Sequence, residues 1–382
     1  MTSASIWAEI DLAAIGHNVR QLRGLLRPPT NFMAVVKANG YGHGAEAAAR
    51  AALDNGATRL GVARLEEGIA LREVGLDAPI LVFGHTAADT TDQLLNYALE
   101  ATVYNYDTAA AYAARARQLK RRLPVHVKID TGMGRLGLFC NQHDAARAAK
   151  DLSHRVGRIA ALKGLRLSGL STHFASADSR DLAFARHQLE RFTRLIAQLH
   201  RDGIDVPLKH AANSAATIQL PEAHLDMVRC GIAIYGLNPS VETRMGPLHL
   251  RPAMTLKSRI IHLKSVPAGT TISYGQTWSA PRATTIATVP VGYADGYNRG
   301  LSSKGQMLVR QSPVPVVGRV CMDLTMLDVG TLPEVALHDE VVVFGRQGEA
   351  FIRADHLAGA LQTINYEIVT AISARVPRVY LI

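Results

Sequence analysis

The sequence predicts an α/β protein in which a TIM-type (β/α)8 barrel is followed by a mostly antiparallel β domain. Over the first 240 residues, short apolar β-type runs alternate with alanine-rich helical segments, which is typical of parallel βα units. There are eight such runs, the number that closes a barrel of this type. After about residue 245 the pattern changes to short β-type runs separated by glycine and proline, which indicates a separate antiparallel domain.

The predicted strands and helices of the barrel alternate along the chain. The strands are expected at residues 32–36, 60–63, 80–83, 101–104, 125–129, 165–171, 208–211 and 227–230. The helices are expected at residues 45–55, 65–74, 87–98, 108–122, 144–162 and 181–202. The last helix is the clearest, because Leu189, Phe192 and Leu199 fall on one stripe. An open doubly wound sheet is the alternative, but the glycines after the first strand do not fit its GxGxxG fingerprint.

The change of pattern sets the predicted domains. Residues 1–240 are expected to form the barrel and residues 241–382 the β domain, with the boundary near residues 240–247. The β-type runs of the second domain are residues 254–266, 284–291, 306–309, 314–320, 324–329 and 340–344. Residues 354–373 are the one convincing helix in this domain.

Composition and charge exclude several classes of protein. Of the 382 residues, 48% are hydrophobic and 19% are charged, as in an ordinary globular protein. The net charge of +10 suggests a nucleic-acid partner, but aromatic residues make up only 5% and the basic residues lie along helical segments. We therefore expect no nucleic-acid partner. No run reaches the ~18 apolar residues of a membrane span, and no signal peptide is readable, so we expect no membrane partner.

The three cysteines, Cys140, Cys230 and Cys321, are far apart and form no CxxC pair. This pattern is typical of reduced thiols in a cytoplasmic protein, and not of a disulfide framework or a zinc site. We therefore expect a cytoplasmic protein without a bound metal.

Reactive side chains recur where the predicted barrel strands end. In a barrel of this type the carboxyl ends of the strands meet at one face, which is where active sites lie. Residues far apart in the sequence are therefore expected to form a single site. They are Lys37 after the first strand, Lys128 and Arg135 at the fifth, His173 at the sixth, His210, Asn213 and Ser214 at the seventh, and Arg229 and Gly231 at the eighth.

Lys37 has the clearest chemical consequence. It follows two valines, so its amine is expected to be desolvated, which lowers its pKa and makes it a nucleophile that forms imines with aldehydes. The next residues, Asn39-Gly40-Tyr41-Gly42-His43-Gly44, contain three glycines that allow the backbone to approach a ligand closely. Tyr41 adds a phenol donor.

Residues 35–44, Val-Val-Lys-Ala-Asn-Gly-Tyr-Gly-His-Gly, resemble the pyridoxal-phosphate attachment motif of alanine racemases. Six further motifs match that family in the same order, so the resemblance covers nearly the whole chain. They are DTGMGR at 130–135, HAANS at 210–214, RCGI at 229–232, ISYG at 272–275, GYADGY at 292–297 and CMD at 321–323. The family combines an α/β barrel with a C-terminal β domain, as the pattern of this sequence predicts.

The resemblance implies that pyridoxal 5'-phosphate is bound to Lys37 and that two catalytic bases, Lys37 and Tyr274, act on opposite faces of its imine with the substrate. His173 is implied to lie behind Tyr274. Arg229 is implied to face the pyridine nitrogen. Because arginine keeps its proton, the ring becomes a weaker electron sink, and the carbanion is quickly reprotonated at Cα. This favours racemisation over transamination.

The resemblance also implies the other contacts of the site. Residues that hold the cofactor, chiefly its phosphate, are Tyr41, His210, Asn213, Ser214, Gly231, Ile232 and Tyr366. The substrate is implied to contact Arg135, the main-chain N–H of Met322, and Tyr293 near the entrance. Lys128 matches a position that is often carboxylated in the family, and a carbamate there would pair with Arg135.

The predicted function is the interconversion of L-alanine and D-alanine, supplying D-alanine for peptidoglycan, by a homodimer with shared active sites. A broad-specificity or serine racemase of the same fold is one alternative. A barrel-type pyridoxal-phosphate decarboxylase is a second, but it would be expected to use an acid where this chain has Arg229. A non-catalytic pyridoxal-phosphate-binding protein is a third, but it would have no use for Tyr274.

Overall fold

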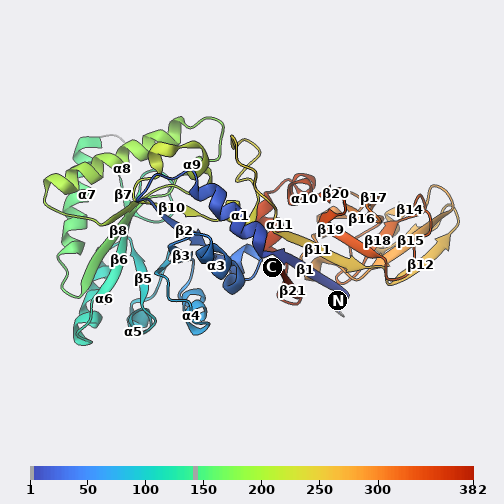
Figure 1. The fold of residues 1–382 in the computed structure, drawn as a ribbon, viewed down its shortest axis with the longest axis horizontal. Helices are drawn as coiled ribbons and strands as arrows, with labels where there is room; N and C mark the ends of the chain where they lie inside the picture. Colours follow the sequence, from blue (N-terminus) through green and yellow to red (C-terminus); the bar gives the residue numbers. More distant parts are fainter. Residues whose placement is uncertain (1–3, 141–144) are drawn as a thin grey trace. The chain divides into compact units, whose positions relative to one another are not determined.

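The computed structural model describes residues 4–140 and 145–382, and these residues divide into two compact units. The barrel unit consists of Ile15–Gly40 and Ala45–Arg251. The β unit consists of the residues up to Ala14, Tyr41–Gly44 and Pro252–Ile382. Figure 1 shows both units in the colours of the sequence.

Eight parallel strands form the barrel. In spatial order they are β10 (Met227–Cys230), β2 (Asn31–Val35), β3 (Arg59–Val62), β4 (Ile80–Val82), β5 (Leu99–Val103), β6 (Leu123–Asp130), β8 (Leu165–Ser171) and β9 (Leu208–His210). A short further strand, β7 (Leu138–Phe139), pairs parallel with β6 outside this series. Hydrogen bonds also join the two ends of this series, from the Asp226 N–H to the Lys209 carbonyl (3.1 Å) and from the Arg229 N–H to the Ala212 carbonyl (3.0 Å). All eight predicted strands are present, and the predicted barrel fold is confirmed.

Helices alternate with these strands, as predicted. They are α1 (Leu12–Arg23), α3 (Ala45–Asp54), α4 (Leu65–Glu73), α5 (Thr91–Asn96), α6 (Tyr106–Gln118), α7 (Ala145–Ala160), α8 (Ala183–Arg201) and α9 (Ser214–Gln219), with 3-10 turns η1 (Ala88–Thr90), η2 (Pro221–Ala223) and η3 (Ile232–Tyr235). Helices α7 and α8 pack against each other (Figure 1). Phe192, Leu195 and Leu199 of α8 are buried, which is why their stripe was legible in the sequence. Asp144, the predicted first residue of α7, lies outside the described residues.

The β unit is built on a seven-stranded sheet in the order β17 (Ser312–Pro315), β16 (Gln306–Val309), β19 (Glu340–Gln347), β11 (Met254–Arg259), β1 (Ile6–Asp11) and β21 (Arg378–Leu381), with β20 (Ala350–Ile352) paired to β19. All its pairs are antiparallel except β1 with β21. A second sheet contains β12 (His262–Val266), β15 (Thr284–Val289) and β18 (Thr325–Asp328), and β13 (Thr271–Ile272) pairs with β14 (Trp278–Ser279). The predicted antiparallel β domain is confirmed.

The β unit differs from the sequence-based expectation at its first strand and at its C-terminal helix, and the run expected at 254–266 is two strands, β11 and β12, in different sheets. Strand β1 was expected to belong to the barrel, as part of residues 1–240, but it lies between β11 and β21 because Trp7, Ala8 and Ile10 are buried in the β unit. The single helix expected at 354–373 is two helices, α10 (Ala354–Leu361) and α11 (Asn365–Thr370). The break falls at Gln362, whose φ of 55° is left-handed and ends the first helix.

No helix in the described part of the chain is long and apolar enough to cross a membrane. Within residues 4–140 and 145–382 the cysteines form no disulfide.

Asn18 of α1 is a buried polar side chain whose hydrogen bonds hold the helix to the end of the barrel unit. Its Nδ2 donates to the carbonyls of Ile234 (3.1 Å) and Arg251 (2.8 Å), and its Oδ1 accepts from the Arg251 N–H (2.8 Å). We predict that Asn18→Leu lowers the free energy of unfolding by about 3 kcal/mol, because it leaves these buried backbone groups unsatisfied. Urea unfolding monitored by far-UV circular dichroism measures the change.

The neighbouring His17 provides the control, because its bond to the His249 carbonyl is exposed. His17→Ala is expected to change the free energy by only about 0.5 kcal/mol. If both substitutions lower the free energy of unfolding equally, the buried hydrogen bonds of Asn18 do not stabilise the protein more than the exposed bond of His17.

Candidate active site

The carboxyl ends of the barrel strands bring together the residues that the sequence singled out in this unit. Lys37 lies two residues after β2, Lys128 lies within β6, and His173 lies two residues after β8. His210 is the last residue of β9, and Arg229 is the penultimate residue of β10. The structure places the other predicted residues, Tyr41, Tyr274, Tyr293, Met322 and Tyr366, in the β unit.

Lys37 begins a left-handed turn, α2 (Lys37–Tyr41). Residues 38, 39, 40 and 41 have φ values of 52°, 52°, 60° and 52°. Left-handed backbone costs about 1–2 kcal/mol for each residue with a side chain, so the turn must be held by its surroundings. The Glu67 carboxylate accepts the N–H of Ala38 (2.6 Å) as well as that of Ala63, the residue after β3 (2.7 Å). Glu67, which the sequence analysis missed, therefore fixes the backbone beside the lysine.

The charges around Lys37 favour its neutral amine. Burial and the nearby Arg135 guanidinium lower the pKa of Lys37, and the Glu67 carboxylate partly opposes them. Burial, with Arg229 and Arg135, also lowers the pKa of Lys128 well below its ordinary value. The guanidinium groups of Arg135 and Arg229 make this end of the barrel electropositive, which suits an anionic ligand.

Arg229 is the buried centre of the barrel site. Its Nη1 donates to His210 Nδ1 (2.8 Å), and its Nη2 donates to the carbonyls of Thr172 and Ala211 (both 2.9 Å). Nη2 also lies 3.2 Å from Nδ1 of His173. These hydrogen bonds all use Nη1 and Nη2. Among the described residues the Nε–H of Arg229 donates to no other group, so it remains available to a ligand. Burial, followed by Lys128 and Arg229, lowers the pKa of His173 well below its ordinary value, so the ring is neutral.

A line of buried polar side chains continues from His210 into the barrel. Nε2 of His210 lies 2.8 Å from Nδ1 of His126, and Nε2 of His126 lies 3.1 Å from the Glu100 carboxylate. Glu100 also forms an ion pair with Arg59. Burial by itself would raise the pKa of Glu100. The hydrogen bonds and charges of His126 and Arg59 outweigh it and lower this pKa to about 2. Arg59, Glu100 and His126 were not predicted from the sequence, because their only signal was a polar position within an apolar strand.

Polar groups after β9 and β10 gather around Ser214. Its Oγ accepts the N–H of Gly231 (2.9 Å) and that of Ala233 (3.4 Å) in η3. Asn213 caps α9 by accepting the Ala216 N–H (2.9 Å). The hydroxyl and the backbone N–H groups that the sequence assigned to anion binding are therefore brought together.

Tyr274 lies on a strained turn of the β unit, η4 (Tyr274–Gln276). Ser273 before it has φ 68°, and Gly275 and Gln276 after it have φ 71° and 50°. The Ser273 hydroxyl anchors the turn by donating to the Arg319 carbonyl (2.7 Å). Tyr274 is 71% exposed in the single chain, so its phenol is available to a ligand or another surface.

Tyr293 and Met322 lie on two backbone segments that are bonded to each other. The N–H groups of Tyr293 and Ala294 in η5 (Tyr293–Asp295) donate to the carbonyls of Cys321 (3.1 Å) and Met322 (3.0 Å). The approach requires Gly292, because a Cβ there would lie 2.2 Å from the Met322 carbonyl oxygen.

Asp295 is a buried acid that the sequence analysis did not single out, although it lies within the GYADGY motif. Its carboxylate accepts the Gly292 N–H (2.8 Å) and pairs with Arg375 (2.6 Å). Arg375 also pairs with Asp323, beside Met322, at 2.6 Å. These ion pairs link the two segments of the β unit that carry Tyr293 and Met322.

Tyr41 and Tyr366 face each other in the β unit, with ring centroids 6.1 Å apart. Tyr366 belongs to α11. Gly42 allows this contact, because a Cβ at this position would lie 2.1 Å from the Val369 carbonyl oxygen. Arg378 donates to the Gly42 carbonyl (3.0 Å). The two phenols that the sequence assigned to the phosphate are therefore neighbours.

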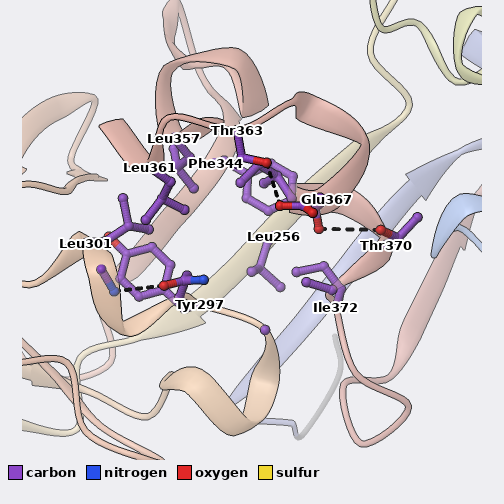
Figure 2. A pocket seen from close by; sticks show the side chains of 15 residues that line it. Leu256, Tyr297, Leu301, Phe344, Leu357, Leu361, Thr363, Glu367, Thr370 and Ile372 are labelled. Atoms are coloured by element: carbon purple, nitrogen blue, oxygen red, sulfur yellow. Dashed lines mark hydrogen bonds between the residues drawn. The ribbon is translucent and has the colours of Figure 1, made fainter. Parts of the chain in front are cut away.

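The β unit also contains a cavity of about 570 Å³ that is lined in part by residues of α10, α11 and η6 (Arg299–Leu301). Figure 2 shows Leu301, Leu357 and Leu361 on one side of it and Glu367 with Thr370 on the other. None of the predicted site residues lines this cavity. Within the described residues no group of three or more His, Cys, Asp or Glu side chains could hold a metal ion.

The fold and these residues define a two-unit barrel enzyme whose site combines a desolvated amine with cationic, anion-binding groups. The family models "Alanine racemase, N-terminal domain" and "Alanine racemase, C-terminal domain" match residues 10–239 and 253–380. The alanine racemase of Desulfosudis oleivorans is 52% identical over all of this chain and 97% of its own length. The chain belongs to the alanine racemase family, and the resemblance found in the sequence is confirmed.

Solved structures show the same similarity. An alanine racemase from Clostridium difficile is 37% identical with a TM-score of 0.93, over 100% of this chain and 97% of that one. A histidine racemase from Leuconostoc mesenteroides is 28% identical with a TM-score of 0.90, over 100% of this chain and 99% of that one.

The electrostatics of Lys37 give a prediction that needs no bound ligand. In the ligand-free protein, we expect Lys37 to be methylated by formaldehyde and cyanoborohydride with a half-titration pH below the ~10.4 of an ordinary lysine. Mass spectrometry of the peptides follows the labelling. Arg135→Gln should move this midpoint up and Glu67→Gln should move it down, because the two charges act in opposite directions. Shifts of the same sign in both variants would contradict this account.

Proposed function

We propose that this protein is a pyridoxal-phosphate-dependent racemase that interconverts L-alanine and D-alanine. The observation that carries the proposal is Arg229, a buried arginine whose terminal nitrogens are bonded and whose Nε–H remains available among the described residues. Membership of the alanine racemase family supports the same reaction.

The residues present fit pyridoxal phosphate. Lys37 offers an amine with a lowered pKa, as an imine-forming lysine requires. The Ser214 hydroxyl and the Ile232 N–H would hold the phosphate, with the Gly231 N–H, which donates to Ser214 Oγ, beside them and Asn213 capping the adjacent helix. Tyr41 and Tyr366 would add their phenols, and Arg229, supported by His210, would meet the ring nitrogen. When bound, the cofactor supplies a conjugated ring that takes up the electron pair left at Cα after proton removal.

Arg229 decides which reaction this site favours. Burial lowers its pKa to about 10, so the guanidinium still carries its charge at pH 7. It can donate a hydrogen bond to a ring nitrogen but does not give up its proton there. By giving a ring nitrogen only a hydrogen bond, Arg229 would keep a bound cofactor a weak electron acceptor, which would favour return of the proton to Cα and hence racemisation over transamination.

Lys37 and Tyr274 are proposed as the two bases that exchange the Cα proton from opposite sides. The lowered pKa of Lys37 increases the fraction of amine that can accept a proton at neutral pH. Tyr274 presents an exposed phenol on its strained turn. His173 is neutral, so it can accept a hydrogen bond from Arg229, and we propose that it lies behind Tyr274 and helps to hold its proton.

Arg135, the Met322 N–H and Tyr293 are proposed to bind the substrate. The Arg135 guanidinium is exposed and would pair with the alanine carboxylate. The strongly lowered pKa of Lys128 favours its neutral amine, the form that reacts with carbon dioxide. A carbamate on Lys128 would be anionic and would pair with the Arg135 guanidinium, and we propose that it forms.

We propose that the reaction takes place in the cytoplasm and supplies D-alanine for peptidoglycan. The absence of a disulfide among the described cysteines agrees with a reducing compartment.

The first test is a racemisation assay of the holoprotein. We predict that L-alanine loses its circular-dichroism signal in the presence of the protein, and that borohydride fixes the cofactor to the peptide containing Lys37. Lys37→Ala should lower kcat by more than about 10³-fold, since it removes a group that acts both as anchor and as base. Label on a different lysine, or no loss of the alanine signal, would overturn the proposal.

Substrate breadth is measured in the same assay. L-Histidine is included because a histidine racemase shares this fold at 28% identity, and L-serine because a serine racemase of the same fold is the alternative that the sequence left open. We expect alanine to have the highest kcat/KM. A higher value for either of the other amino acids would favour the broad-specificity alternative.

We further propose a homodimer in which each site takes Lys37 from one protomer and Tyr274 from its partner. The two bases lie in different units of the chain, Lys37 in the barrel unit and Tyr274 in the β unit. Tyr274, Tyr293 and Met322 are 71%, 42% and 53% exposed in the single chain, as expected of side chains that a second copy covers. A twofold dimer would contain two equivalent sites of this kind.

Mixed dimers test this arrangement. Homodimers of Lys37→Ala and of Tyr274→Phe should each be nearly inactive. A heterodimer of the two variants would have one doubly damaged site and one intact site, so it should recover about half of the wild-type activity. Differently tagged chains allow the heterodimer to be isolated before the assay. If isolated heterodimers are as inactive as their parents, both bases come from one chain.

A further inference from the structure

The line of buried side chains behind Arg229 has a fixed direction of hydrogen bonding. A guanidinium has no acceptor, so Arg229 Nη1 donates to His210 Nδ1, which cannot carry a proton. The single proton of His210 is therefore on Nε2, and it is donated to Nδ1 of His126. By the same reasoning the proton of His126 is on Nε2 and is donated to the Glu100 carboxylate.

Both ends of this line are charged, and its middle is neutral. Arg229, at 6% exposure, is the cationic end, and Glu100, at 8%, is the anionic end, where Arg59 also contacts it. The two imidazoles between them are at most 1% exposed. In such a dry interior each hydrogen bond polarises the next, so the carboxylate makes His210 Nδ1 a stronger acceptor for Arg229.

The four side chains of this line come from four different strands of the barrel, so the line extends across the barrel interior. Glu100 is on β5, His126 on β6, His210 on β9 and Arg229 on β10. Interiors of such barrels are usually filled by branched apolar side chains. Glu100 is therefore an exception: a buried acid joined to Arg229 by hydrogen bonds through two intervening histidines. Such an exception needs a physical role.

We propose that Glu100 is a positioning residue, which acts through His126 and His210 to fix the guanidinium plane of Arg229 and so direct its Nε–H at the cofactor ring. This inference rests on the proposed function. Glu100 itself touches neither substrate nor cofactor in this proposal. Its carboxylate sets the proton positions of both imidazoles, and these hold Arg229 as a hydrogen-bond donor.

Two substitutions separate the charge of Glu100 from its hydrogen bond. The same carboxylate oxygen meets His126 and Arg59, so Glu100→Gln can keep both bonds while it removes the charge. Glu100→Leu removes the acceptor as well. His126 is then free to carry its proton on Nδ1, which would force His210 to present Nδ1–H toward Arg229.

A matched control is available on the same strand. Thr102 lies two residues after Glu100, so its side chain is on the same face of β5. It is 5% exposed and donates to the Val82 carbonyl (2.7 Å). Thr102→Val removes a buried hydrogen bond without touching the line to Arg229. It therefore reports the effect of a purely structural defect in this part of the barrel.

The measured quantity is the partition between two outcomes in the holoenzyme. Racemisation is followed by circular dichroism, and half-transamination by the pyruvate released as the amino group of alanine passes to the cofactor. We expect the ratio of pyruvate formed to alanine racemised to rise about threefold in Glu100→Gln and about tenfold in Glu100→Leu, as a charge-assisted hydrogen bond is weakened and then lost. kcat should fall more than KM changes, since Arg135 is intact. Thr102→Val should keep the wild-type ratio.

A second measurement needs no turnover. In wild-type protein labelled with 15N-histidine, His126 and His210 should both carry their proton on Nε2, and Glu100→Leu should move a proton to Nδ1. Wild-type imidazoles protonated on Nδ1 would overturn the proposal even if a variant failed to fold. A partition ratio unchanged in both Glu100 variants would also overturn it. If the wild type does not racemise alanine, the proposed function fails, whereas the proton positions still test the hydrogen-bonded line.

Discussion

The buried guanidinium of Arg229 is the constraint on which the rest of the barrel site depends. Moving a cation out of water costs several kcal/mol unless its donors are satisfied. Here the carbonyls of Thr172 and Ala211, together with His210, satisfy the two terminal nitrogens. These acceptors lie just beyond or at the ends of β8 and β9, so the charge can be buried only if those strands end at the right height. The cation therefore ties the register of the barrel to the chemistry of its open end.

The same end of the barrel accumulates positive charge, and this controls its other groups. Lys37 and Lys128 are kept toward their neutral forms by burial and by neighbouring guanidinium groups, so their amines are available for covalent chemistry. Strain is concentrated where such groups must be presented. The left-handed backbone beside Lys37 and around Tyr274 is held by local hydrogen bonds, with Glu67 and Ser273 as the anchors.

Much of the fold could be predicted from the sequence because the barrel strands are continuous apolar runs separated by amphipathic helices. Strand β1 could not be assigned in this way. Its partner β11 lies more than 240 residues further along the chain, and six residues contain no information about so distant a pairing. The break at Gln362 was also invisible, since a left-handed position is usually marked by glycine or asparagine.

The sequence by itself determined which reactive groups stand at the strand ends, because strand order and the carboxyl-end rule bring them to one face. It thereby gave Lys37, His173, His210 and Arg229 as members of one site. Only the tertiary structure decided how Glu100, His126 and His210 join end to end behind Arg229. The alternation of a strand shows that a side chain points inward, but not which inward side chain of another strand lies at the same height. That height depends on the register and shear of the closed barrel, which are properties of all its strands together.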